Sequence, residues 1–509
     1  MVSSSWGEGT RERVLIRKSC RRRAFMPEFP FTSMRDWLQY LEDNGELLTV
    51  NEQVDLRGGV AALAYQSARS GLYGPESGPA LLFTNIKGYP GWRIATNAMY
   101  GRHRLAKAMD VSADPRRFYH EVVAKIEQAM PPMEVTTAPC KEIIWRGEEA
   151  DLARIPVPFT GELEGVPNIT AGISNIREPD TGWQNIAVRR FGVKGSHTLS
   201  EFLNRTQQDY MIFMRYIDKG QPAPVAIIIG ADPVTYIVSQ IKMPIGFCEY
   251  DIWGGITGSP LEVVQCETSD LLVPASAEVV IEGEILPDEF EVDGPFPEFE
   301  LYYTILARVV RVRVKCITMR KDPIYYYMLM GVPPTEGHSI GGTMIGVSHL
   351  RGLLRAFPGI INLHVPHHQY GHIVVVQVAK EVAKAWSQFA VQVGFEVMKT
   401  AAFKGVIVVD EDCEDITNWE FVLDEIQCKF QASKDLTIIP RMVHTELNPS
   451  EPWAGKWGWN DRFIIDATEP PPGYDEGYLR GKGYPPKWAR EEAEKMWPGL
   501  LQSLKGAGR

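Results

Sequence analysis

Two short segments combine charged or amide side chains with apolar neighbours, in a pattern that could bind a carboxylate and move a proton. Residues 185–190 read Asn-Ile-Ala-Val-Arg-Arg, and residues 293–298 read Asp-Gly-Pro-Phe-Pro-Glu. The guanidinium of Arg190 is always charged, and its planar fork matches a carboxylate. Asp293 and Glu298 flank a Gly-Pro turn, so one acid could be ionised against Arg190 while the other keeps its proton. We therefore expect acid/base chemistry on a carboxylic acid; the alternative is a structural ion pair beside an ordinary turn.

The composition is that of an ordinary globular protein. The chain has 509 residues, of which 44% are hydrophobic and 23% are charged, and this length predicts two or three domains. The net charge of −11 argues against a nucleic-acid partner and gives no reason to expect a membrane partner. The seven cysteines are dispersed and no apolar run is long enough to span a membrane, so we expect a cytoplasmic protein. Residues 1–26 are expected to be a disordered or non-native lead, with a targeting peptide as the less favoured alternative.

The sequence divides into three regions with different patterns of apolar, β-branched and turn residues, and these regions must position Arg190, Asp293 and Glu298. Residues 27–145 alternate short strands with helices and predict a small α/β domain. Residues 146–320 contain many β-branched runs separated by turn residues, which is typical of a β-barrel or sandwich. After a linker at 321–340, residues 341–470 alternate strands and helices again and predict a mostly parallel sheet. Residues 471–509 are expected to form an extension with a terminal helix.

Two polar clusters in the third region have simple explanations. The acids at 410–412 end a predicted strand, and we expect them to cap helix N-termini rather than to bind a metal. A proline and a glycine interrupt the four histidines 364, 367, 368 and 372, so a solvated turn is expected rather than a zinc site.

Several motifs in a fixed order resemble the UbiD family, the prenylated-flavin-dependent reversible decarboxylases of aromatic and unsaturated acids. They are Gln-Asn-x4-Arg at 184–190, Glu-Tyr at 249–250, Val-Pro-Ala-Ser-Ala-Glu-Val-Val-Ile-Glu-Gly at 273–283, and Asp-Gly-Pro-Phe-Pro-Glu at 293–298. Each motif alone is weak, but their number and order identify the family. The resemblance implies a multi-domain α/β chain whose central split β-barrel, related to flavin reductases, holds prenylated FMN.

The resemblance also implies roles for individual residues. Arg190 would orient the substrate carboxylate while paired with Asp293, which is one methylene shorter than the family's glutamate, and Glu298 would donate the proton. Side chains alternate along a strand, so only one of Arg189 and Arg190 should enter the site, and the spacing from Asn185 favours Arg190. The residues implied to bind prenylated FMN are Asn185, Ile186, Ala187, Val188, Arg189, Arg190, Gln207, Gln208, Glu249 and Lys399.

A divalent metal, usually Mn²⁺, is implied beside the flavin phosphate, with Asn185, Gln208 and Glu249 as its ligands and K⁺ as a further candidate cation. The family has a histidine where this chain has Gln207 or Gln208. A glutamine oxygen can still coordinate a hard cation, so the identity of the metal stays open. The alternative is a polar barrel rim that binds no metal. The residues implied to line the substrate pocket are His338, His444, Thr445 and Leu447.

The expected activity is the non-oxidative, reversible decarboxylation of an aromatic or conjugated acid, with release of CO₂. A net carboxylase subunit acting on a phenol or arene, a non-catalytic relative and a simple flavin reductase are the alternatives. The resemblance further implies a flavin prenyltransferase as the supplier of the cofactor, and a homodimer or homohexamer as the assembly.

Overall fold

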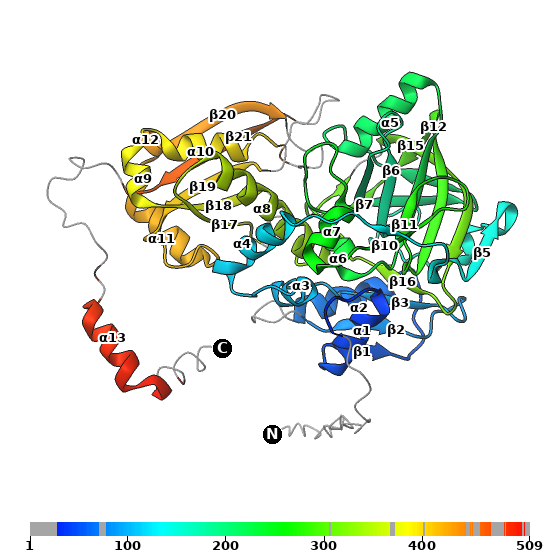
Figure 1. Ribbon diagram of the computed structural model, residues 1–509, viewed down its shortest axis with the longest axis horizontal. Coiled ribbons are helices and arrows are strands. Elements are labelled where there is room, and N and C mark those ends of the chain that lie inside the picture. Colours follow the sequence, from blue (N-terminus) through cyan, green and yellow to red (C-terminus); the bar gives the residue numbers. More distant parts are fainter. Residues whose placement is uncertain are drawn as a thin grey trace, which may run out of the picture.

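In the computed structural model the chain forms three units, with the C-terminal unit beside the barrel and the N-terminal sheet packed beneath the barrel (Figure 1). One continuous cluster of buried apolar side chains runs through all three units, from Trp37 through Ile227 to Val408. Among the described residues, no helix is both long and apolar enough to cross a membrane. The structure describes residues 28–70, 78–304, 307–366, 372–400, 403–443, 448, 450, 459–469, 483, 485–500 and 503.

The N-terminal unit is a four-stranded sheet, in the order β1-β2-β3-β16, covered by helices. Helix α1 starts at the cap residue Ser33 and buries Trp37, Leu38 and Leu41 on its apolar face. Strand β16 belongs to the segment expected to be a linker, yet it pairs in parallel with β3. The elements are α1 (Met34–Asp43), β1 (Leu47–Val50), α2 (Gly59–Ser70), β2 (Ala80–Phe83), β3 (Arg93–Thr96), α3 (Arg102–Met109), α4 (Pro115–Ile126) and β16 (Ile324–Tyr327).

The central unit is a closed antiparallel β-barrel, as predicted. Its strands follow the order β12-β9-β6-β7-β8-β15, and β12 also pairs with β15, which closes the sheet on itself. Helices α5 and α7 and the hairpin β13–β14 surround one mouth of the barrel, where the predicted site residues lie. The elements are β5 (Ile143–Arg146), β6 (Asn168–Arg177), β7 (Gln184–Gly195), β8 (Thr198–Glu201), α5 (Gln208–Lys219), β9 (Ala223–Ile229), α6 (Pro233–Val238), α7 (Glu249–Thr257), β12 (Val279–Asp293), β13 (Phe296–Pro297), β14 (Tyr303–Thr304) and β15 (Ala307–Met319).

The C-terminal unit is a five-stranded sheet, in the order β17-β18-β19-β21-β20. The central strands β18, β19 and β21 are parallel, and both edge strands are antiparallel to their neighbours. The segment between helices α9 (Lys380–Ala385) and α10 (Phe389–Val397) includes Gln388, which takes a left-handed conformation with φ of 58°. The elements are α8 (Glu336–Ala356), β17 (Ile360–His364), β18 (Ile373–Val378), α9 (Lys380–Ala385), α10 (Phe389–Val397), β19 (Gly405–Asp410), α11 (Trp419–Lys429), β20 (Leu436–Val443), β21 (Trp459–Ala467) and α13 (Lys487–Met496).

Candidate active site

A cavity of about 780 Å³ lies between the barrel mouth and the C-terminal unit. Its volume falls within the range of roughly 300–1,000 Å³ that is common for small-molecule and cofactor sites. Strand β7 forms one wall with residues 185–190, and the hairpin turn forms another with residues 298–300. The C-terminal unit closes the cavity with His372, Met398, Lys399, Thr400, Met442 and Arg462.

Arg190 joins the two acids that the sequence singles out. Its Nε donates a hydrogen bond of 2.8 Å to Oε1 of Glu298, and a terminal nitrogen pairs with Oδ2 of Asp293. Asp293 has further partners, because the Ser200 hydroxyl donates to Oδ1 at 3.0 Å and Lys194 Nζ lies 3.9 Å from the same oxygen. The two acids therefore share one guanidinium but differ in their other contacts.

The electrostatic environment separates these groups. Burial raises the pKa of Glu298, although Arg190 acts in the opposite direction. Burial alone would lower the pKa of Arg190, but its attraction to Glu298 and Asp293 outweighs that effect and raises it. The guanidinium also lies 4.6 Å from the centre of the Phe296 ring, which fixes it further. The raised pKa makes the protonated form of Glu298 more favourable than it is for an ordinary carboxyl group.

Arg189 and Arg190 take separate partners, but both line the cavity, so the expectation that only one of them would enter the site was wrong. Arg189 pairs with the buried Asp209 on α5, whereas Arg190 pairs with the two acids. Both arginines line the cavity. The strands are irregular at this point, because β6 residues Ile169 and Gly172 pair with Phe191 and Arg189 of β7. Two β6 residues therefore lie opposite Arg190 alone, a β-bulge that bends the wall of the site.

Asn185, Gln207, Gln208 and Glu249 all line the same cavity. Glu249 is the first residue of α7, and its Oε2 accepts a hydrogen bond of 3.0 Å from the backbone N–H of Ile186. Burial raises the pKa of Glu249 to about 8. Gln208 is the first residue of α5, and its amide nitrogen donates at 2.7 Å to the carbonyl of Met243. That bond leaves the side-chain oxygen of Gln208 as an available ligand.

These residues fit a hard divalent cation. Glu249 is buried and has no ion-pair partner within the part of the chain that the structure describes. A buried carboxylate without a counter-charge is costly, and a bound cation would remove that cost. One carboxylate and two amide oxygens, from Asn185 and Gln208, are ligands that Mn²⁺ or Mg²⁺ accepts.

The cavity is also suited to an anionic group. The first residues of α5 and α7 both line it, and helix N-termini carry partial positive charge. Lys399 lines the same cavity and pairs with Glu396 at 2.5 Å. Lys242, which the sequence analysis missed, lines the cavity with an exposed side chain. The protein atoms around its ammonium group, together with the charge of Arg189, lower the pKa of Lys242 to about 8.

His338 lies behind the cavity wall. Its Nε2 donates at 2.7 Å to the carbonyl of Phe299, and its Nδ1 is 2.6 Å from the Thr335 hydroxyl. The hydrogen bond from His338 to the Phe299 carbonyl holds the 298–300 turn in place. Direct contact between His338 and the substrate stays a prediction. The other predicted pocket residues, His444, Thr445 and Leu447, lie outside the described residues.

The expectation of a solvated histidine turn was wrong for two of its four members. His364 is buried, because strand β17 carries it into the C-terminal unit. His372 lines the cavity, since it stands directly before β18, with Nε2 3.4 Å from Glu300 Oε1. His367 and His368 are outside the described residues.

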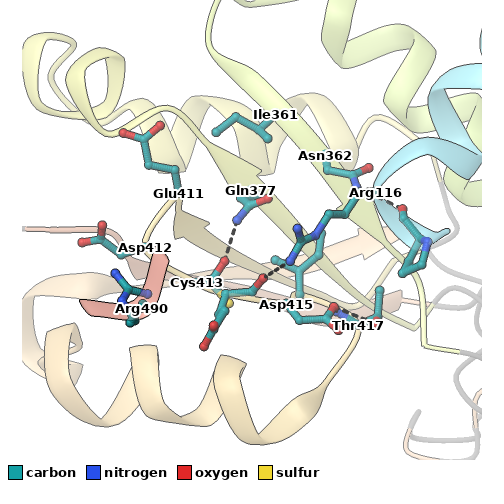
Figure 2. A pocket seen from close by; sticks show the side chains of 13 residues that line it. Arg116, Ile361, Asn362, Gln377, Glu411, Asp412, Cys413, Asp415, Thr417 and Arg490 are labelled. Atoms are coloured by element: carbon teal, nitrogen blue, oxygen red, sulfur yellow. Dashed lines mark hydrogen bonds between the residues drawn. The ribbon is translucent and has the colours of Figure 1, made fainter. Parts of the chain in front are cut away.

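Two of the acids at 410–412, Glu411 and Asp412, border a second cavity of about 700 Å³ between α4 and the C-terminal unit (Figure 2). The expected helix capping was wrong, because Asn418 caps α11 and both oxygens of Asp410 accept hydrogen bonds of 2.8 Å from Lys429. Asp410, Asp412 and Glu469 are close enough together to hold a metal ion, but lysines already neutralise them. This cluster is therefore explained by internal ion pairs.

Comparison with known proteins identifies the family. Models of the 3-octaprenyl-4-hydroxybenzoate carboxy-lyase family match the chain in three parts: the N-terminal domain at residues 38–126, the Rift-related domain at 133–333 and the C-terminal domain at 338–467. The chain therefore belongs to the UbiD family of carboxy-lyases, as the motifs predicted.

Solved structures agree with this assignment over nearly the whole chain. The UbiD-class enzyme HmfF from Pelotomaculum thermopropionicum, in complex with FMN, is 30% identical with a TM-score of 0.78, over 90% of this chain and 99% of that one. Vanillic acid decarboxylase from Sedimentibacter hydroxybenzoicus, in its closed form, is 26% identical with a TM-score of 0.84, over 92% and 99%. The 3,4-dihydroxybenzoic acid decarboxylase of Klebsiella pneumoniae is 25% identical with a TM-score of 0.77, over 92% and 100%.

Proposed function

We propose that this chain is a prenylated-FMN-dependent, non-oxidative decarboxylase of an aromatic or conjugated carboxylic acid. The observation that carries the proposal is the bridge from Arg190 to both Asp293 and Glu298, at the wall of a cavity between barrel and C-terminal unit. The comparisons support the substrate class, because two similar structures are decarboxylases of hydroxylated aromatic acids. They support the cofactor, because HmfF has been solved with FMN and with prFMN.

Arg190 binds and orients the substrate carboxylate. Oδ2 of Asp293 pairs with the guanidinium of Arg190, and the Ser200 hydroxyl donates a hydrogen bond to Oδ1 of Asp293. These contacts position the guanidinium before the substrate binds. Loss of CO₂ from an sp² carbon leaves an electron pair that the substrate cannot delocalise, and the prenylated flavin supplies the electron sink when it is bound. Glu298 then delivers a proton to the carbon that has lost CO₂, which its raised pKa allows near neutral pH.

The apolar part of the cavity wall contacts the aromatic or conjugated part of the substrate and excludes water. Met328, Met330, Met398 and Met442 line it, together with Ile340. Methionine side chains adapt to flat rings and make favourable contacts with aromatic groups. Asn185, Gln208 and Glu249 would hold Mn²⁺ or a similar cation against the flavin phosphate, and Lys242 would be a further phosphate ligand. K⁺ stays a prediction.

The chain is proposed to work in the cytoplasm as a homodimer or homohexamer, with a flavin prenyltransferase as the source of its cofactor. An evolved dimeric form is known for HmfF, which supports self-assembly. The physiological direction is set by the CO₂ concentration, since one site serves decarboxylation and carboxylation alike.

The proposal is tested by producing the protein together with a flavin prenyltransferase. We expect a bound flavin whose mass and absorption spectrum match the prenylated form, and release of CO₂ from members of a panel of aromatic acids. In D₂O the product should carry deuterium at the carbon that lost CO₂. Bicarbonate incorporation into a phenol would assign the chain to net carboxylation. Retention of unmodified flavin chemistry, with NAD(P)H oxidation and no CO₂ exchange, would refute the proposal.

A further inference from the structure

Glu300 is a buried carboxylate in the active-site cavity that the proposed mechanism does not use. It stands two residues after Glu298 and lines the same cavity. Its side chain is 2% exposed, and neither carboxylate oxygen accepts a hydrogen bond from any described residue. Buried carboxylates normally accept several hydrogen bonds, because the loss of water is otherwise uncompensated. The carboxylate of Glu300 is therefore available to accept a hydrogen bond from a bound ligand.

Among the described residues, the ion-pair contact of Glu300 comes from another unit of the chain. Nε2 of His372, at the start of β18, is 3.4 Å from Oε1 of Glu300. This contact brings the C-terminal unit against the barrel hairpin at the cavity wall. It engages at most one of the two oxygens, and Oε2 of Glu300 has no such contact among the described residues.

The hairpin turn fixes the direction of Glu300. The turn is closed by a hydrogen bond of 3.0 Å from the Glu298 N–H to the Tyr302 carbonyl, and His338 holds the Phe299 carbonyl at 2.7 Å. Leu301 takes a left-handed conformation with φ of 78°, which is rare and costly for a branched side chain. Leu301 and Tyr302 project outward and are 51% and 61% exposed, whereas Glu300 stays buried. The backbone is thus held in an unfavourable conformation while one carboxylate faces the cavity.

We infer that Glu300 selects acids whose ring carries a hydrogen-bond donor, either a hydroxyl group or a ring N–H. This inference rests on the proposed function, because Arg190 must hold the carboxylate of the same molecule. Glu298 and Glu300 are two residues apart, which places their backbones no more than about 7 Å from each other. A single ring can therefore be held at its carboxylate by Arg190 and at its donor by Glu300. An acid without a donor leaves Glu300 unpaired and is disfavoured.

The test compares matched pairs of acids that differ only in the donor. The hydroxyl pair is 4-hydroxybenzoate and benzoate, and the N–H pair is pyrrole-2-carboxylate and furan-2-carboxylate. Dissociation constants are measured by titration calorimetry on FMN-loaded protein, so that no acid is consumed. We expect the wild type to prefer the donor-bearing member of one pair by about 10- to 100-fold. Which pair shows the preference distinguishes a hydroxyl substrate from a ring N–H substrate.

Glu300→Gln and Glu300→Leu should reduce that preference to about twofold or less, mainly by weakening the donor-bearing acid. Glu289→Gln is the control, because Glu289 is a partly exposed glutamate paired with Arg311 and Arg313 outside the cavity. It should keep the wild-type preference. Melting temperature and FMN fluorescence quenching confirm that each variant folds and binds flavin.

The outcomes separate the two proposals. Equal affinity for both members of each pair in the wild type, or a preference that survives in folded Glu300→Gln and Glu300→Leu, overturns the role of Glu300. The proposed function would then still stand if Arg190→Lys weakens all the acids that bind. Failure of every acid to bind the wild type overturns the proposed function, and the inference about Glu300 with it.

Discussion

Replacement of Glu298 by glutamine is the sharpest test of the proposed proton donor. The substitution keeps the size of the side chain, and its oxygen can still accept the 2.8 Å hydrogen bond from Arg190 Nε. It removes only the transferable proton. Because burial already favours the neutral form of Glu298, exchanging one neutral group for another should change the free energy of unfolding by less than about 1 kcal/mol.

The expected loss of turnover is much larger than this change in stability. A positioned general acid contributes roughly 10²- to 10⁴-fold, which corresponds to about 2.7–5.5 kcal/mol of transition-state stabilisation. The assay is CO₂ release by the prenylated-FMN holoenzyme under saturating acid, with the cofactor quantified by absorption in each preparation. Glu298→Gln should bind the flavin as the wild type does and turn over at least 100-fold more slowly.

Glu164→Gln provides a matched control. Glu164 is also a buried glutamate with a raised pKa in the same unit, but it accepts hydrogen bonds from Gly161 and Asn168 and does not line the cavity. Its substitution should leave turnover within about threefold of wild type. Undiminished turnover by flavin-loaded Glu298→Gln would show that another group delivers the proton, and the reasoning from the Arg190 bridge would fail.

Five further predictions follow from the structure. Turnover should fall as pH rises through the raised pKa of Glu298, because the donor must be protonated, and a rate that is flat or rises across this limb contradicts its role. Arg190→Lys loses the fork that spans Asp293 and Glu298, so kcat/KM should drop by about 10- to 100-fold in steady-state assays. Mn²⁺ binding to the apo protein at pH 7 should release about one proton, because the pKa of Glu249 is raised to about 8. Calorimetry in buffers of different ionisation enthalpy measures this proton release, and Glu249→Gln should abolish the release. The folded-state pKa of Glu249 lies above its ordinary value of 4.5, so the apo protein should lose stability as pH rises from about 4.5 to 8, and Glu249→Gln should flatten that loss in thermal melts. Gly172→Ala would place a methyl group 2.9 Å from Ile227, so urea unfolding should show a loss of about 1–3 kcal/mol.

The sequence predicted the parts of the site that belong to contiguous motifs. Residues 185–190 lie within strand β7, and residues 293–298 run from the end of β12 through β13, so each motif is a continuous segment that the family resemblance could identify. The β-branched runs and turn residues predicted a barrel or a sandwich, because these patterns are local, and the family resemblance implied the barrel.

The parts that were missed depend on contacts between units. The Glu300–His372 contact exists only because the C-terminal unit docks on the barrel hairpin, and no local pattern records that docking. Lys242 looks like an ordinary loop lysine until the cavity places it beside Arg189. The hydrogen bonds of His338 to Thr335 and to a backbone carbonyl of the hairpin turn are likewise contacts that the sequence does not reveal.

Strand β16 has a consequence for how the protein is made. The N-terminal sheet is completed only when Ile324–Tyr327 pairs with β3, and the whole barrel lies between these two strands in sequence. While the nascent chain leaves the ribosome, β3 therefore keeps an open edge until the barrel has been synthesised, and open edges invite wrong pairing. The N-terminal unit should not be separable by truncation: a fragment ending before β16 would lack one strand of its own sheet. The first and second units must mature together.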